Sequence, residues 1–170
     1  FYSAFFFRNE FYGDYLYFII ILFICIFTDI GGYAFGKFFK GPKLTKISPK
    51  KTYSGVVGGY LLSIIFITLF FNNLDFISEL IKIEVTSKEL SLENFILTIY
   101  ISTVSQFGDI IVSFFKRKSN IKDTGKIIPG HGGLLDRIDG MIFAYPAAYL
   151  LYKILIWWEK KLQYWVQLVL

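Results

Sequence analysis

Four apolar segments separated by charged loops constrain this chain more than any other feature of its sequence. They cover residues 15–28, 56–71, 95–112 and 140–158. Two of them are shorter than the ~20 residues that cross a bilayer squarely, but flanking Tyr, Phe and Asn residues can extend them into the interface. A chain that is 55% hydrophobic and 21% aromatic is also too apolar for an ordinary soluble domain. The sequence therefore predicts an all-α integral membrane protein, a polytopic helical bundle with about four transmembrane helices.

Basic and acidic residues alternate between the loops. Residues 35–55 carry six lysines and no acid, and the loop after the third segment is again basic. Between the second and third segments, residues 72–94 carry five acids and two lysines. Because basic loops tend to stay on the cytoplasmic side of a membrane, we expect both basic loops in the cytoplasm and the acidic loop outside. The expected location is therefore an inner or plasma membrane.

The chain reads as a single membrane domain over residues 1–170, because no internal repeat, linker or heptad pattern divides it. Residues 1–7 look like the end of an apolar helix and lack the features of a signal peptide. We therefore expect the C-terminal part of a longer protein whose N-terminal helices are missing. The tail, residues 157–170, mixes tryptophans with charges and predicts an interfacial amphipathic helix. The single cysteine, Cys25, excludes a disulfide within the chain.

The densest cluster of charge lies between the third and fourth apolar segments. If this stretch begins as a helix, Asp109, Ser113 and Arg117 share one face, with Lys116 close to Ser113. Asp109 and Asp136 stand at the two membrane boundaries of the stretch and can share divalent metal ions, because hard cations prefer oxygen ligands. The residues favour a metal site for these two carboxylates, and the alternative is that they form salt bridges with neighbouring cations.

The same stretch supplies groups that bind phosphate. The cationic side chains that can neutralise phosphates are Lys116, Arg117, Lys122, Lys126 and Arg137. The glycine turn around His131 offers backbone N–H groups to phosphate oxygens, and a lone histidine of this kind is more often a turn residue than a metal ligand. Asp123 and Asp139 can act in catalysis or can pair with neighbouring Lys or Arg residues as structural bridges.

The other basic loop follows the first apolar segment. Asp29 ends that segment, which is costly in a membrane unless the carboxylate meets a cation, a metal or water. Lys50 and Lys51 stand beside Ser and Thr hydroxyls, an arrangement suited to a polyphosphate or an anionic lipid head group. The alternative is that these lysines only follow the positive-inside rule and touch lipid phosphates without selectivity.

Taken together, these residues resemble the CDP-diacylglycerol synthase family, the phosphatidate cytidylyltransferases. The family signature reads S-x-x-K-R-x-x-x-x-K-D-x-x-x-x-x-P-x-H-G-G-x-x-D-R-x-D. The chain supplies every fixed position: Ser113, Lys116, Arg117, Lys122, Asp123, Pro129, His131, Gly132, Gly133, Asp136, Arg137 and Asp139. An upstream block, from Asp29 to Gly55, is similar to the family's other cytoplasmic block, although Ser54 stands where many relatives have an acidic residue or glutamine.

The resemblance implies a nucleotidyltransferase that converts CTP and phosphatidic acid to CDP-diacylglycerol and pyrophosphate, with one or two Mg²⁺ ions. It implies Asp109 and Asp136 as metal ligands, Asp29 as a nearby accessory acid, and catalytic roles for Lys116 and Arg117. The groups expected to bind the substrates and their phosphates are Ser113, Lys122, Asp123, His131, Gly132, Gly133, Arg137, Asp139, Lys50 and Lys51. The expected partners are CTP, phosphatidic acid and the lipid bilayer but not nucleic acid, and the sequence allows a homodimer. The resemblance also implies a bacterial inner or plasma membrane, with the active-site loops cytoplasmic.

Two other classes of protein fit part of the pattern. A metal-coupled transporter also places acids at broken helices, but it does not need a dense cationic loop with a glycine turn. A non-catalytic membrane protein that binds anionic lipid would keep the basic loops and show no dependence on CTP. A nucleic-acid-binding surface is disfavoured, because the basic clusters adjoin membrane spans.

Overall fold

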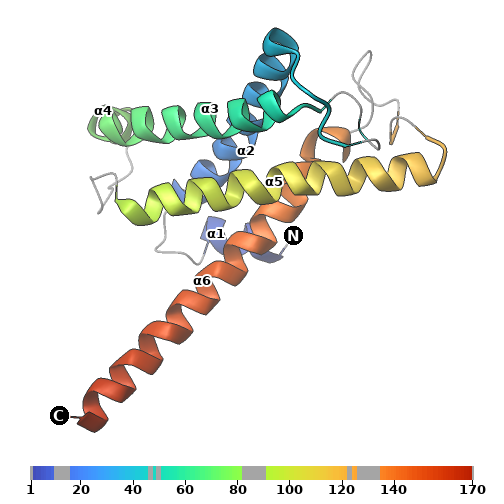
Figure 1. Ribbon diagram of the computed structural model, residues 1–170. Coiled ribbons are helices and arrows are strands. Elements are labelled where there is room, and N and C mark those ends of the chain that lie inside the picture. Colours follow the sequence, from blue (N-terminus) through green and yellow to red (C-terminus); the bar gives the residue numbers. More distant parts are fainter. Residues whose placement is uncertain are drawn as a thin grey trace.

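The computed structural model of the chain describes residues 2–9, 16–45, 48, 51–81, 91–121, 124–125 and 135–169. Within these ranges the chain forms six α-helices and no β-sheet (Figure 1). The helices are α1 (Tyr2–Asn9), α2 (Leu16–Phe39), α3 (Tyr53–Asn72), α4 (Leu74–Ile81), α5 (Leu92–Lys118) and α6 (Leu135–Val169). The prediction of an all-α protein is confirmed.

Four of these helices are long and apolar enough to cross a membrane. They are α2, α3, α5 and the part of α6 from Ile138 to Gln163. The predicted number of membrane spans is therefore confirmed. Each helix also extends past the apolar segment that predicted it, because hydropathy marks the part of a helix that lies in hydrocarbon, whereas backbone hydrogen bonds continue the helix into the interface.

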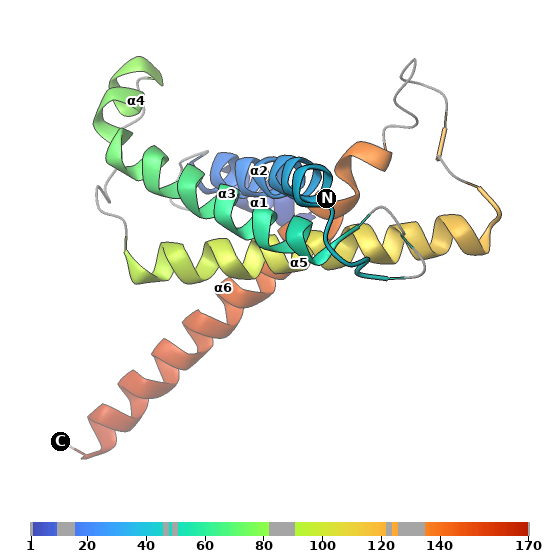
Figure 2. The same ribbon diagram turned by 45° about the horizontal axis from the view of Figure 1, so that its top comes forward.

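Two boundaries differ from what the sequence predicted. α2 does not end at Thr28 but continues through Asp29 to Phe39, so the segment expected to open the first basic loop is helical. The tail is helical as predicted, but it continues α6 instead of forming a helix of its own. In both views the C-terminal half of α6 extends away from the other helices (Figures 1 and 2).

Glycines explain why α2 can remain helical beyond Thr28. A Cβ atom on Gly31 would collide with the backbone carbonyl of Gly58 in α3, and a Cβ atom on Gly58 would collide with the side chain of Phe35. Small residues of this kind let two membrane helices approach until their backbones touch. The close packing of α2 on α3 brings Asp29 next to the beginning of α3, where the first basic loop returns to the bundle.

Small polar side chains line the buried face of α5. Thr98, Ser102 and Ser105 are fully buried, and Thr28 of α2 donates a hydrogen bond of 2.9 Å to Ser102 Oγ. Hydroxyl groups at such an interface are small enough for close packing and also link the helices through hydrogen bonds. α5 thereby contacts α2, α3 and α6 at once and forms the centre of the bundle.

The two basic loops approach the bundle at the same end. α3 begins, α5 ends and α6 begins on one side of the molecule, whereas α4 and the beginning of α5 lie on the other side (Figure 1). The helix ends that border the acidic segment thus lie opposite the beginning of α3 and the end of α5, and the side of the membrane on which each loop lies stays a prediction.

Candidate active site

A short hairpin-like turn between α2 and α3 fixes the backbone of Lys51. The Leu44 N–H donates a 2.8 Å hydrogen bond to the Lys51 carbonyl, and the Tyr53 N–H donates a 3.1 Å bond to the Pro42 carbonyl. Lys51 in turn donates its backbone N–H to the Ser48 carbonyl over 3.0 Å. Three backbone hydrogen bonds thus hold the loop against the beginning of α3, while the long side chain of Lys51 is left to reach across to α5.

Hydroxyl groups reinforce the same turn. Thr52 caps α3, because its side chain accepts a 3.1 Å hydrogen bond from the Gly55 N–H. Ser54 Oγ lies 3.0 Å from Thr52 Oγ1 and accepts a 3.3 Å hydrogen bond from the Gly41 N–H. Ser54 therefore joins the two sides of the turn and has a structural role here.

A cavity of about 420 Å³ lies between this turn and the helices α2, α3, α5 and α6. Three of its lining residues are carboxylates from three different helices: Asp29 from α2, Asp109 from α5 and Asp139 from α6. Lys51 and Ser113 also line the cavity. The residues that the sequence singled out in two distant loops therefore come together around one space at the end of the membrane bundle.

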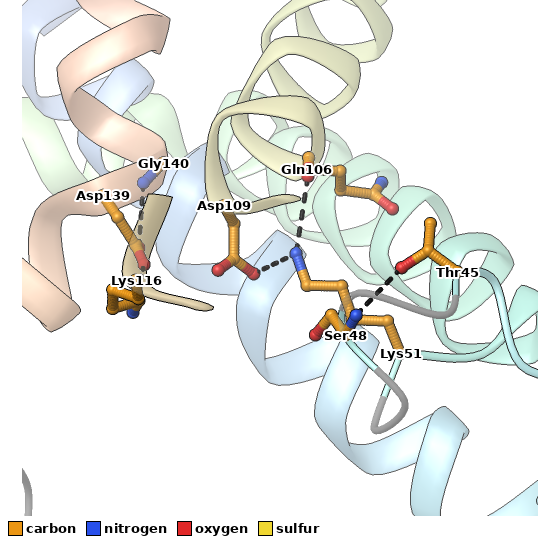
Figure 3. Close-up of polar contacts among 8 residues, drawn as sticks. All are labelled: Thr45, Ser48, Lys51, Gln106, Asp109, Lys116, Asp139 and Gly140. Atoms are coloured by element: carbon orange, nitrogen blue, oxygen red, sulfur yellow. Dashed lines mark hydrogen bonds and ion pairs between the residues drawn. The ribbon is translucent and has the colours of Figure 1, made fainter. Parts of the chain in front are cut away.

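Two lysines compensate part of this negative charge (Figure 3). Lys51 forms an ion pair with Asp109 and donates a 3.5 Å hydrogen bond to the Gln106 carbonyl. Lys116 Nζ lies 3.8 Å from Asp139 Oδ2, and Asp139 Oδ1 accepts a 3.0 Å hydrogen bond from the Gly140 N–H. Asp139 thus makes the pairing with a lysine that the sequence allowed. Three carboxylates and two ammonium groups give this cluster a formal charge of −1.

The remaining predicted site residues fall into two groups. Arg117 is exposed in the last turn of α5 and is not among the described residues that line the cavity. Asp136 and Arg137 belong to the first turn of α6, although their side chains lie outside what the structure describes. The other predicted residues lie outside the described residues altogether: Lys50, Lys122, Asp123, His131, Gly132 and Gly133.

Two lining residues, Thr28 and Gln106, were not predicted from the sequence. Gln106 precedes Asp109 by three residues, so the two share a face of α5. Thr28 lies in an apolar segment directly before Asp29. Uncharged polar residues inside apolar segments are common enough that neither stands out without the helix packing.

Comparison with known proteins assigns the chain to a family. Residues 1–155 match the family model described as "Cytidylyltransferase family". The chain belongs to this family. It is 40% identical over 136 residues to a protein of Rickettsia felis named "Phosphatidate cytidylyltransferase", a match that covers 77% of this chain and 57% of the relative. A protein of the same name from Rickettsia conorii is 43% identical over 128 residues, covering 73% of this chain and 53% of the relative.

The similarity extends to distant bacteria. The protein of that name from Thermotoga maritima is 39% identical over 129 residues, which cover 76% of this chain and 44% of the relative. The chain spans about half the length of the curated relatives it matches. The membership in the cytidylyltransferase family agrees with the resemblance drawn from the signature that begins at Ser113.

The donor set of the cavity fits a divalent cation such as Mg²⁺. Among the described residues no three acidic, histidine or cysteine side chains form a ready-made metal cluster. Mg²⁺ does not require one, because it is usually held by one or two carboxylates together with substrate phosphates and water. Asp109 lines the cavity and already attracts the ammonium group of Lys51. Its hard oxygen atoms suit this cation, and the cavity leaves room for phosphates and water.

Proposed function

We propose that the chain is the membrane-embedded catalytic part of a phosphatidate cytidylyltransferase, which transfers the cytidylyl group of CTP to phosphatidic acid. The observation that carries the proposal is the cavity at one end of four membrane-spanning helices, where Asp29, Asp109 and Asp139 meet Lys51. Membership of the cytidylyltransferase family and similarity to proteins named phosphatidate cytidylyltransferase support the choice of reaction.

The chemistry of the substrates explains why the site contains cations and carboxylates but needs no general base. The nucleophile is a phosphate monoester, whose second pKa is about 6, so it is largely ionised near neutral pH. One of its oxygens forms a bond to the α-phosphorus of CTP, the bond between that phosphorus and the β-phosphate oxygen breaks, and pyrophosphate leaves. The main obstacle is repulsion between two anions, which positive charge at the site relieves.

In this proposal the residues of the chain divide into two sets. Lys51, Lys116 and Ser113 bind and orient phosphate oxygens, together with the signature residues that follow α5. Asp109 and Asp136 hold Mg²⁺, and Asp29 lies close by as an accessory acid. The metal, one ion or two, supplies positive charge that stabilises the transferring phosphoryl group and the leaving pyrophosphate. Asp139 holds Lys116 in place.

The membrane supplies the second substrate. The described helices expose large apolar side chains around the cavity end of the bundle, including Phe107 and Phe114 of α5. Phosphatidic acid would therefore reach the cavity sideways from the bilayer, with its acyl chains against such surfaces and its phosphate at the boundary. We propose that this boundary is the cytoplasmic one, where CTP is available and where the positive-inside rule puts both basic loops.

The decisive experiment is to measure release of pyrophosphate from CTP by the full-length protein in detergent micelles. Wild-type protein should require both phosphatidic acid and Mg²⁺. Asp109→Asn and Asp136→Asn should each lose at least about a hundredfold in kcat, because removing a charge that binds the metal ion removes stabilisation of the transition state. Glu159→Gln, an equivalent change at an exposed position far along α6, serves as the matched control and should retain full activity.

Two results would contradict the proposal. Full metal-dependent turnover in both Asp→Asn variants would exclude the metal-ligand roles. A folded wild-type protein that binds anionic lipid but never releases pyrophosphate would instead support the non-catalytic lipid-binding alternative.

A further inference from the structure

The side chain of Gln106 lies at the cavity without a role in the chemistry described so far. It comes from α5, three residues before Asp109, and is the one amide side chain among the described lining residues. In Figure 3 its carboxamide points away from Lys51 and Asp109, although its own backbone carbonyl binds Lys51. The cavity therefore has a charged part, suited to phosphates, and a separate uncharged polar part at Gln106.

Hydrogen bonds fix which end of the Gln106 amide faces the protein core. Gln106 Nε2 donates to Ser102 Oγ over 3.4 Å, and the same oxygen accepts the 2.9 Å hydrogen bond from Thr28 Oγ1. Ser102 is fully buried and Thr28 nearly so. Ser102 Oγ therefore accepts two hydrogen bonds, one from Thr28 Oγ1 and one from Gln106 Nε2. The amide nitrogen is thus held on the core side.

The opposite end of the amide remains available. No described residue donates a hydrogen bond to Gln106 Oε1. Gly59 of α3 provides the space for this arrangement, since a Cβ atom there would come within 3.3 Å of Gln106 Nε2 and 3.0 Å of the Thr28 carbonyl oxygen. The carboxamide therefore presents a hydrogen-bond acceptor in a defined orientation, and a ligand at this position must bring a donor.

We propose that Gln106 is a specificity-determining residue that accepts a hydrogen bond from the 4-amino group of cytosine. Cytosine carries an N–H₂ donor at the position where uracil carries an acceptor oxygen. A freely rotating amide could offer either its oxygen or its nitrogen to the base and would therefore bind cytosine and uracil alike. An amide whose nitrogen is bound to Ser102 offers its oxygen, which favours the amino group of cytosine. This inference rests on the proposed function, which supplies CTP as the substrate and directs its triphosphate to the side of Lys51.

The test compares CTP with UTP, which differ in the base edge that Gln106 would contact. For the full-length protein in detergent, we would measure the dissociation constants of both nucleotides without lipid, and kcat/KM for both with phosphatidic acid. Wild-type protein should prefer CTP. Gln106→Leu should weaken CTP binding about tenfold, the loss expected for one hydrogen bond whose donor is left unpaired, and should leave UTP nearly unchanged.

A second variant tests the orientation itself. Ser102→Ala releases the amide, so UTP should bind more tightly than to wild type while CTP binding falls only slightly. A purely structural role for Ser102 would lower the affinity for both nucleotides together. If Ser102→Ala unfolds, Ser102→Cys keeps a side chain of similar size but replaces the oxygen by a weak acceptor, and it makes the same prediction. Melting temperatures identify variants that fail to fold.

The outcomes separate this inference from the proposed function. An unchanged ratio of CTP to UTP affinity in folded Gln106→Leu protein would overturn the role of Gln106, even if the enzyme is fully active with CTP. Absence of lipid-dependent turnover with any nucleotide in wild-type protein would overturn the proposed function. Lipid-dependent turnover that shows no preference for CTP over UTP in wild-type protein would overturn the inference alone.

Discussion

Replacing Lys51 with methionine should affect the binding of metal and the binding of nucleotide in opposite directions. Lys51 pairs with Asp109, the carboxylate assigned to the metal in the proposed function. A metal ion and the lysine ammonium therefore compete for the same carboxylate. Methionine has a similar length and no charge, so Lys51→Met removes the competitor and leaves the packing of the turn between α2 and α3 largely intact.

The size of both effects can be worked out from the contacts. The side chains of Lys51 and Asp109 are 23% and 31% exposed, so their ion pair contributes about 1 kcal/mol, near the upper end for exposed pairs. Losing it should strengthen metal binding roughly fivefold. A lysine hydrogen-bonded to a phosphate contributes about 1.5–3 kcal/mol, so the same variant should bind CTP roughly tenfold to a hundredfold more weakly.

The assay is binding of Mn²⁺ to the detergent-solubilised protein, followed by electron paramagnetic resonance without nucleotide. A separate titration measures CTP. Lys153→Met is the matched control, because the ammonium group of Lys153 lies over the rings of Phe6 and Tyr149 at 5.8 and 5.4 Å, away from the cavity. Asp109→Asn should lose Mn²⁺ affinity. Unchanged or weaker Mn²⁺ binding in folded Lys51→Met protein would refute the competition.

Two further predictions concern the scaffold around the site. Gly58→Ala should lower the free energy of unfolding by about 1–3 kcal/mol, because the added Cβ atom would overlap the side chain of Phe35. Thermal unfolding in detergent measures the loss of stability. Gly32→Ala is the control, because the atom nearest to a Cβ atom on Gly32 lies 3.7 Å away, which is an ordinary contact. An equal loss of stability in both variants would contradict the packing argument. Ser54→Ala should raise KM for CTP a few-fold with little effect on kcat, because it loosens the turn that holds Lys51. A fall in kcat alone would contradict that role.

The sequence was informative about the membrane spans and about the charged residues of the site. Apolar segments predicted four spans, and the structure has four helices of the required length and hydropathy. Asp109, Ser113 and Lys51 were predicted from residue type and spacing, and all three line the cavity. Charged residues are rare in a membrane protein, so each one carries information about function even before its partners are known.

The end of α2 and the place of Gln106 could not be predicted in this way. Both depend on how the helices pack against one another, which the sequence does not show directly. Asp29 and the glycines after it have low helical or membrane propensity, and only the fit of Gly31 against Gly58 makes a continued helix favourable. The orientation of Gln106 likewise depends on Ser102 and α2, which are adjacent only in the folded bundle.

The balance of charge in the cavity links these observations to a sequence of binding events. The three carboxylates Asp29, Asp109 and Asp139 outnumber Lys51 and Lys116 by one, and the resulting formal charge of −1 favours binding of a cation. In the proposed function, a metal ion bound with the nucleotide would take the carboxylate of Asp109 and leave Lys51 to bind the phosphates. Gln106 is uncharged, so its proposed contact with the base would add selectivity without changing the charge of the cluster. A nucleotide with its metal would then bind more tightly than the metal-free nucleotide.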